Sequence, residues 1–312
     1  MAVLCVGIIP VVAKPVKIPY VSVPLATPDT SITCESVSDD SNTVAVGLKD
    51  GTVALYDTTS KHWLLRTARL HDDGIQSIAF KPDTSTFATT STDTALVVCD
   101  THTGAIKQKI DAGVAGLYVA YSPDGKYLAE ATTGGEDATG LPQQSVIIWD
   151  TANYTKKQEI VTDGPATNLS FSDSPERLLI SAADVNIYDF ATRKRIWTQE
   201  IAPQSYASIS PDGKIAACST GLWRISTNKR LSDVGSQCNM SAFTRTTPSF
   251  AIYGSEEDGW SMFDGATGKE IAELDAGENY ACLAPNGKFI AAGYNTGELT
   301  IYKIDAGNIK KQ

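Results

Sequence analysis

The stretch Tyr121-Ser122-Pro123-Asp124-Gly125-Lys126, followed by Tyr127-Leu128-Ala129 and then Val146-Ile147-Ile148-Trp149-Asp150, decides the fold. A short apolar strand ends in a turn, where Pro presets φ and Asp-Gly tolerates the left-handed conformation that reverses the chain. A second apolar strand, a polar loop and a third strand follow. The third strand ends in an aromatic residue and an Asp. This pattern predicts a small antiparallel sheet.

The same unit recurs seven times along the 312 residues. Clear copies of the turn are Ile209 to Lys214 and Leu283 to Lys288. The third strands end at positions 57, 100, 150, 189, 224, 264 and 303, which lie 43, 50, 39, 35, 40 and 39 residues apart. A turn containing Thr and Gly then leads to a fourth strand, as in Thr101 to Ile110. No segment shows sustained helical periodicity, so the repeat predicts an all-β array of four-stranded units.

On these residues the chain resembles the WD-repeat β-propeller family over about residues 30 to 304. Only Trp149-Asp150 is a literal Trp-Asp pair; most other units have Tyr, Cys or Phe in place of Trp, and the fifth unit has Trp223-Arg224. The resemblance implies a seven-bladed β-propeller of four-stranded antiparallel blades. It also implies that His71, at the family's Gly-His position, bonds to Asp93 in the following loop.

Closing such a ring requires one blade built from both ends of the chain, because a single blade cannot bury both of its faces. The last unit, 280–304, supplies three strands, so residues 16–312 are expected to form one domain. Val16 to Val23 is the preferred closing strand, within a closing and lead-in segment 16–31, and Pro19 is expected on its outer edge. Val3 to Val12 is the alternative. Residues 1–15 would form an arm that packs along the last blade or adds a strand to a partner.

In this family the loops between fourth and first strands and between second and third strands share one face, called the top face here. Basic residues are few in these loops, chiefly Lys49 and Arg69. The expected partner-binding residues, mostly acidic, are Asp72, Asp73, Asp111, Glu136, Asp137, Leu141, Asp163, Glu256, Glu257, Asp275, Glu278 and Glu298. They predict a face that attracts basic peptides or basic protein surfaces.

The third unit carries a long insertion, Thr132 to Gln144, between its second and third strands. Its Gly and polar residues, with Leu141-Pro142 as an apolar tip, fit either a contact loop or a tolerated insertion. The fifth unit, Ser205 to Ser236, is the shortest and predicts a small blade. Outer segments such as Trp63-Leu64-Leu65 and Ile196-Trp197 offer apolar patches for a larger assembly.

Composition excludes several classes of function. The net charge of −10 argues against nucleic-acid binding. The six cysteines contain no CxxC pair, and the three histidines lie in different units, so no metal or cofactor site is predicted. No catalytic motif is present, and no catalytic residue is assigned. The apolar run Ala2 to Val12 is too short to span a membrane and lacks signal-peptide flanks, so a cytoplasmic protein is expected.

These observations predict a non-catalytic scaffold or adaptor for protein–protein interactions, a monomeric propeller acting within a complex. A structural subunit of a large assembly is the first alternative. An enzyme of lactonase or quinoprotein type is the second, because the repeats of those propellers contain similar Ser-Pro-Asp-Gly-Lys turns.

Overall fold

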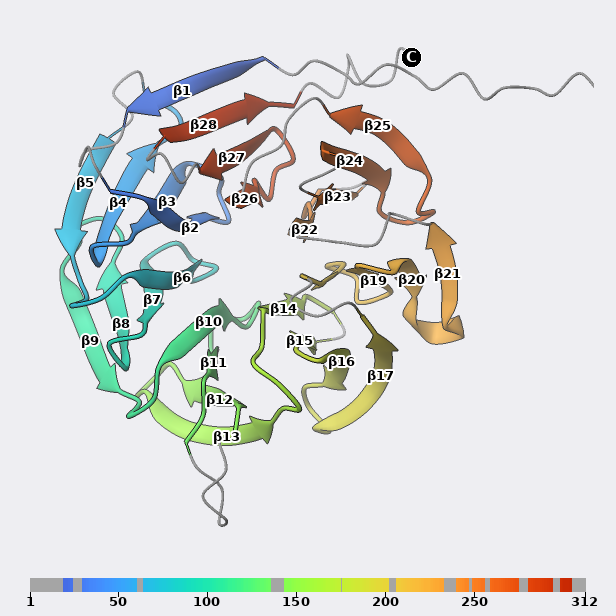
Figure 1. The fold of residues 1–312 in the computed structure, drawn as a ribbon, viewed down its shortest axis with the longest axis horizontal. Helices are drawn as coiled ribbons and strands as arrows, with labels where there is room; N and C mark the ends of the chain where they lie inside the picture. The colour runs from blue at the N-terminus through green and yellow to red at the C-terminus, as the bar shows by residue number, and fades with distance from the viewer. Residues whose placement is uncertain are drawn as a thin grey trace, which may run out of the picture.

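The structure is a computed structural model that describes residues 19–24, 30–60, 64–135, 143–174, 176–201, 206–232, 240–246, 249–255, 259–274, 280–293 and 298–304. These residues form seven four-stranded sheets arranged around a common axis (Figure 1). Neighbouring strands within every sheet are antiparallel, and each sheet is one blade. The predicted seven-bladed β-propeller is therefore confirmed.

The first four blades are each continuous in sequence, and their strands run in order from the axis outward. Blade 1 contains β2 (Ile32–Val37), β3 (Thr43–Leu48), β4 (Thr52–Asp57) and β5 (Leu64–Arg69). Blade 2 contains β6 (Ile75–Phe80), β7 (Thr86–Ser91), β8 (Ala95–Asp100) and β9 (Ile106–Asp111). Blade 3 contains β10 (Gly116–Tyr121), β11 (Tyr127–Thr132), β12 (Ser145–Asp150) and β13 (Thr155–Val161). Blade 4 contains β14 (Asn168–Ser172), β15 (Arg177–Ser181), β16 (Asp184–Asp189) and β17 (Lys194–Glu200).

Of the remaining three blades, blade 5 is short and blade 7 closes the ring. Blade 5 contains β18 (Ser208–Ile209), β19 (Ile215–Cys218), β20 (Gly221–Arg224) and β21 (Lys229–Ser232), with a 3-10 turn, η1 (Ile225–Thr227), before β21. Blade 6 contains β22 (Met240–Phe243), β23 (Phe250–Ser255), β24 (Gly259–Asp264) and β25 (Glu270–Leu274). Blade 7 contains β26 (Tyr280–Leu283), β27 (Phe289–Gly293), β28 (Glu298–Lys303) and, outermost, β1 (Tyr20–Pro24). The seven third strands end at the seven predicted positions, and blade 5 is small, as expected.

The first turn of each repeat is held by its own side chains. In blade 3 the Ser122 hydroxyl donates to the Asp124 carboxylate at 2.8 Å and accepts the Tyr127 N–H at 3.0 Å. Gly125 has a φ of +68°, which glycine adopts without strain. The Ser-Pro-Asp-Gly-Lys sequence therefore fixes the hairpin that begins the blade.

The hydrophobic core lies between blades. One cluster packs Leu96 and Val98 of blade 2 against Val119, Leu128 and Trp149 of blade 3. Each of these side chains is at most 8 % exposed. Because a blade buries its faces only against its neighbours, the ring must close before the first and last blades are covered.

Strand β1 closes the ring by pairing with β28, with Tyr20 opposite Tyr302 and Pro24 opposite Glu298. The carbonyl of Pro19 accepts a hydrogen bond from the Lys303 N–H at 2.9 Å. The predicted closing strand is confirmed in its second half, with Pro19 immediately before the strand. Residues 16–18 and the arm 1–15 lie outside the described residues, so the arm stays a prediction.

The outer strands correct one expectation about apolar patches. Leu64 and Leu65 of β5 are 45 % and 52 % exposed. Trp197 of β17 is only 7 % exposed, because its indole N–H bonds to Asn228 of blade 5 at 2.9 Å and its ring packs near Trp223. Trp197 therefore joins two blades and offers no external surface. Trp63 lies outside the described residues.

Candidate functional site

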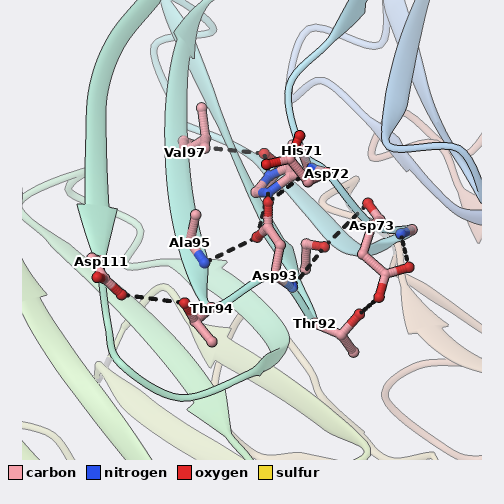
Figure 2. A network of polar contacts seen from close by, with 12 residues as sticks. His71, Asp72, Asp73, Thr92, Asp93, Thr94, Ala95, Val97 and Asp111 are labelled. Atoms are coloured by element: carbon pink, nitrogen blue, oxygen red, sulfur yellow. Dashed lines mark hydrogen bonds and ion pairs between the residues drawn. The ribbon is translucent and has the colours of Figure 1, made fainter.

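His71 lies on the top face, in the loop that joins β5 to β6. The backbone N–H groups of Leu70 and His71 both bond to the Gly51 carbonyl, which fixes the loop against blade 1. The His71 ring, 2 % exposed, contacts Asp93 Oδ1 through Nδ1 at 2.9 Å and Thr89 Oγ1 through Nε2 at 2.8 Å (Figure 2). The predicted pairing of His71 with Asp93 is confirmed, whereas the part played by Thr89 was not predicted.

The protonation of this group follows from its surroundings. Burial lowers the pKa of His71, although the bond and charge of Asp93 oppose the effect. Burial acts to raise the pKa of Asp93, but the Asp72 N–H and the His71 ring outweigh it and hold that pKa below its usual value. A neutral His71 therefore donates from Nδ1 to a charged Asp93 and accepts the Thr89 hydroxyl proton at Nε2. The Val97 carbonyl lies farther from Thr89 Oγ1, at 3.4 Å.

Three exposed carboxylates surround this buried group. Besides bonding to His71, Asp93 accepts the N–H of Asp72 at 3.0 Å. The Thr92 hydroxyl donates to Asp73 at 2.7 Å, and the Thr94 hydroxyl donates to Asp111 at 3.2 Å (Figure 2). The loop between β7 and β8 thus ties together the two top loops that flank blade 2.

The local charge is negative and held in place. The Thr92 hydroxyl, followed by the Gly74 N–H, keeps the pKa of Asp73 below its usual value, so its carboxylate is charged at neutral pH. The guanidinium of Arg69 donates to the His71 carbonyl at 3.3 Å. Fixed carboxylates attract a cation without first having to be ordered.

The structure brings together part of the predicted acidic set. Asp72, Asp73 and Asp111 lie around the loop between β7 and β8 of blade 2, with Asp111 and Asp73 on opposite sides of it, and all three are exposed. Asp163 lies between β13 and β14, and Glu298 begins β28; both are exposed but belong to other parts of the ring. The remaining predicted residues lie outside the described residues: Glu136, Asp137, Leu141, Glu256, Glu257, Asp275 and Glu278.

A second buried group in blade 3 was not predicted. By strand register Glu130 of β11 corresponds to Thr89 of β7, since they pair with Ile147 and Val97 at the same point of the third strand. Glu130 is 0 % exposed and accepts the Trp149 indole N–H at 2.8 Å. Burial raises its pKa to about 7, although the bond from Trp149 opposes the effect. A charged residue within the apolar run Tyr127 to Thr132 was the signal in the sequence.

Another carboxyl lies where the ring closes. Glu35 of β2 accepts the Gly293 N–H of β27 at 2.7 Å, across the contact between blades 1 and 7. Burial raises its pKa to about 8, although the Gly293 N–H opposes the effect.

On the opposite face from His71, Arg245 of blade 6 contacts Asp39 of blade 1 at 3.0 Å and Asp173 of blade 4 at 3.6 Å. These three blades are not neighbours, so Arg245 links inner turns from separate parts of the ring.

Among the described residues, no cluster of three or more His, Cys, Asp or Glu side chains is arranged to hold a metal ion. The four described cysteines, Cys34, Cys99, Cys218 and Cys282, are free thiols. No helix in the described ranges is both long and apolar enough to cross a membrane.

Comparison with known proteins agrees with this architecture. The family described as "WD domain, G-beta repeat" matches residues 22–57 and 63–100. The chain is similar to autophagy-related protein 16 of Arabidopsis thaliana, with 23 % identity over 287 residues, and the match covers 84 % of this chain but only 53 % of that protein. This chain therefore spans about half the length of that relative.

Among solved structures, it is similar to the β-propeller domain of Cps50 (Swd1) from Myceliophteria thermophila. The TM-score is 0.71 at 16 % identity, covering 92 % of this chain and all of that one. From its repeats, its closed ring and these likenesses, we conclude that the chain is a seven-bladed β-propeller, in which residues 22–57 and 63–100 match the WD40 repeat.

Proposed function

We propose that this protein is a non-catalytic adaptor whose top face binds basic peptides or the basic surfaces of partner proteins. The observation that carries the proposal is the group of exposed carboxylates on blade 2, Asp72, Asp73 and Asp111, held by the Thr92–Thr94 loop. Because Asp93 beneath them is also charged, the local field favours cations. The likeness to a plant autophagy-related protein and to a Swd1 propeller domain is compatible with this role.

The geometry favours recognition over catalysis. The carboxylates of Asp73 and Asp111 are solvent-exposed and already accept hydrogen bonds, and His71 is buried and neutral. Thr89, His71 and Asp93 form a chain of hydroxyl, imidazole and carboxylate, but Thr89 and His71 are 0 % and 2 % exposed, so a substrate has no access to the hydroxyl as a nucleophile. We infer a binding platform that acts in the cytoplasm as a single propeller joined to partner proteins. The insertion 132–144 is proposed to add contacts at the edge of the same face.

Fluorescence anisotropy with a labelled octapeptide rich in Lys and Arg tests the proposal. The double variant Asp73→Asn with Asp111→Asn should weaken binding about tenfold, since each exposed ion pair contributes up to about 1 kcal/mol. Raising the salt concentration from about 50 to about 500 mM should weaken wild-type binding by a similar factor. The matched control is Glu159→Gln with Glu273→Gln, which removes the same charge from outer strands. Unchanged affinity in the Asp variant, or affinity that does not respond to salt, refutes the proposal.

A further inference from the structure

A cavity of about 350 Å³ lies between blades 1 and 2, on the face opposite His71. Its walls come from β5 of blade 1, from the start of β3, and from two turns of blade 2 that follow β6 and β8. The lining residues are Thr43, Leu65, Arg66, Thr84, Ser85, Thr101 and His102. Hydroxyl groups therefore dominate its polar surface, with one guanidinium and one imidazole beside them.

One of these hydroxyls departs from the pattern of the neighbouring blades. In blade 1 the Thr58 hydroxyl donates to the Ser41 carbonyl at 2.8 Å, and in blade 3 the Thr151 hydroxyl donates to the Gly125 carbonyl at 2.7 Å. Thr101 is the corresponding residue of blade 2, yet its buried Oγ1 has no hydrogen-bond partner among the described residues. A buried polar atom without a partner costs free energy, so rotation of the Thr101 side chain toward a ligand in the cavity would relieve that cost.

The turn beside it is strained. Thr84 has a φ of +57°, whereas the same place in three other turns is held by Gly125, Gly213 and Gly287 at +68°, +67° and +69°. A β-branched residue is a genuine outlier at positive φ, and such strain gathers at functional positions. The unpartnered hydroxyl and the strained backbone thus line the same cavity.

Arg66 is the charged group best placed to bind a ligand there. It crosses from β5 to blade 2, where its Nη1 donates to the Thr103 carbonyl. The chain packs so closely on Gly104 that a Cβ there would lie 2.5 Å from Arg66 Cδ. These contacts hold the guanidinium at the cavity, and its fork of donors matches a carboxylate.

Two carboxylates of blade 2, each next to a lining residue in sequence, are already paired with lysines. Lys81 contacts Asp83 at 3.2 Å, and Lys107 contacts Asp100 at 2.8 Å. Arg66 is the one Arg or Lys side chain among the residues that line the cavity, whereas the top face is acidic.

The rim of the cavity is apolar. Leu65 is 52 % exposed at its edge, and Ile106 on β9 of the next blade is 50 % exposed. Exposed aliphatic side chains on adjacent outer strands, beside a polar cavity, provide the mixed chemistry of an interaction site.

We propose that this cleft is a second binding site, which takes an acidic–aliphatic peptide segment of a partner protein. An Asp or Glu carboxylate of the peptide accepts hydrogen bonds from the Arg66 guanidinium and the Thr101 hydroxyl. Aliphatic side chains next to it in the peptide pack on Leu65 and Ile106. The protein then carries sites of opposite charge preference on its two faces, which lets one propeller join two different partners.

Anisotropy with a labelled, acetylated hexapeptide that alternates Leu with Asp tests the site, with the full chain as receptor. Wild type should saturate below about 1 mM, and Arg66→Gln should weaken binding at least about tenfold. Thr101→Val, which removes the hydroxyl and keeps the shape, should weaken it less, and a peptide with Asn for Asp should not saturate. Arg195→Gln, an equal charge change on the outer strand of blade 4, should leave affinity unchanged. Thermal unfolding of each variant separates a lost site from a lost fold, and Thr101→Val provides a second reading if Arg66→Gln is unstable.

Each other outcome overturns the proposal. Absence of saturable binding by wild type, or equal affinity in Arg66→Gln, removes the site. Binding of inorganic phosphate that depends on Arg66, with no peptide binding, identifies a small-anion site instead. Self-association that is lost in Arg66→Gln, seen by sedimentation, identifies a second copy of this chain as the occupant.

Discussion

Replacing Glu130 with Gln should make the stability of the protein less dependent on pH. The Glu130 carboxyl is 0 % exposed, and its Oε1 has no hydrogen-bond partner in the part of the chain that the structure describes. Burial raises its pKa from the ordinary 4.5 to about 7, against the bond from Trp149. The folded protein therefore keeps a proton on Glu130 over a range where the unfolded chain has released it.

This difference in pKa sets the direction and the size of the change in stability with pH. Because the pKa of Glu130 is higher in the folded protein than in the unfolded chain, its contribution to the free energy of unfolding is complete below pH 4.5. This contribution is lost as the pH rises through about 7. At about 1.4 kcal/mol per pH unit the whole range corresponds to about 3 kcal/mol, of which about 2 kcal/mol falls between about pH 5.5 and 8. Gln keeps the carbonyl oxygen for Trp149 and never ionises. The variant should thus lose about 2 kcal/mol less stability than wild type over this interval.

Urea unfolding, followed by tryptophan fluorescence at both pH values, measures this difference. Titration of other groups, including Glu35, is common to the two proteins and cancels in the comparison. Glu273→Gln, on the exposed face of β25, is the control and should follow wild type. If wild type and Glu130→Gln lose stability equally as the pH rises, the raised pKa of Glu130 is wrong.

Two further variants should change stability in opposite directions. His71→Ala should lower the free energy of unfolding by about 2 kcal/mol, because Asp93 and Thr89 lose their shared partner; a loss below about 0.5 kcal/mol by urea unfolding would show that the group contributes little. Thr84→Gly should raise it by about 1 kcal/mol, because φ +57° suits glycine, and a lower midpoint in urea would contradict the assignment of strain.

The architecture was predictable because it repeats. A turn signal follows the third strand of each unit, so the residue at which each of the seven third strands ends could be predicted from the sequence. The closing strand could be predicted because residues 280–304 supply only three strands, and a four-stranded last blade needs one more strand from elsewhere in the chain. Its expected first residues, 16–18, lie outside the described residues, and Pro19 lies immediately before β1.

Side-chain contacts between blades were harder to predict. His71 and Asp93 were found through their spacing, but Thr92 and Thr94 reach carboxylates of two different loops only once the blades are packed. Trp197 was expected outside because outer strands face solvent, yet the partner of its indole N–H is Asn228, 31 residues later. The unpartnered hydroxyl of Thr101 is recognised only by comparison with the hydrogen bonds of the equivalent Thr residues in blades 1 and 3. The sequence does not contain this information.

The pairing of β1 with β28 has a consequence for biosynthesis. During translation β1 is made long before β28, so β1 stays unpaired until β28 has been made and presents its outer edge. On a crowded polysome, the β1 of a second nascent chain competes for that edge, and exchange of the strand yields interlocked dimers. The rate at which a chain recaptures its own β1 therefore sets the yield of closed monomers.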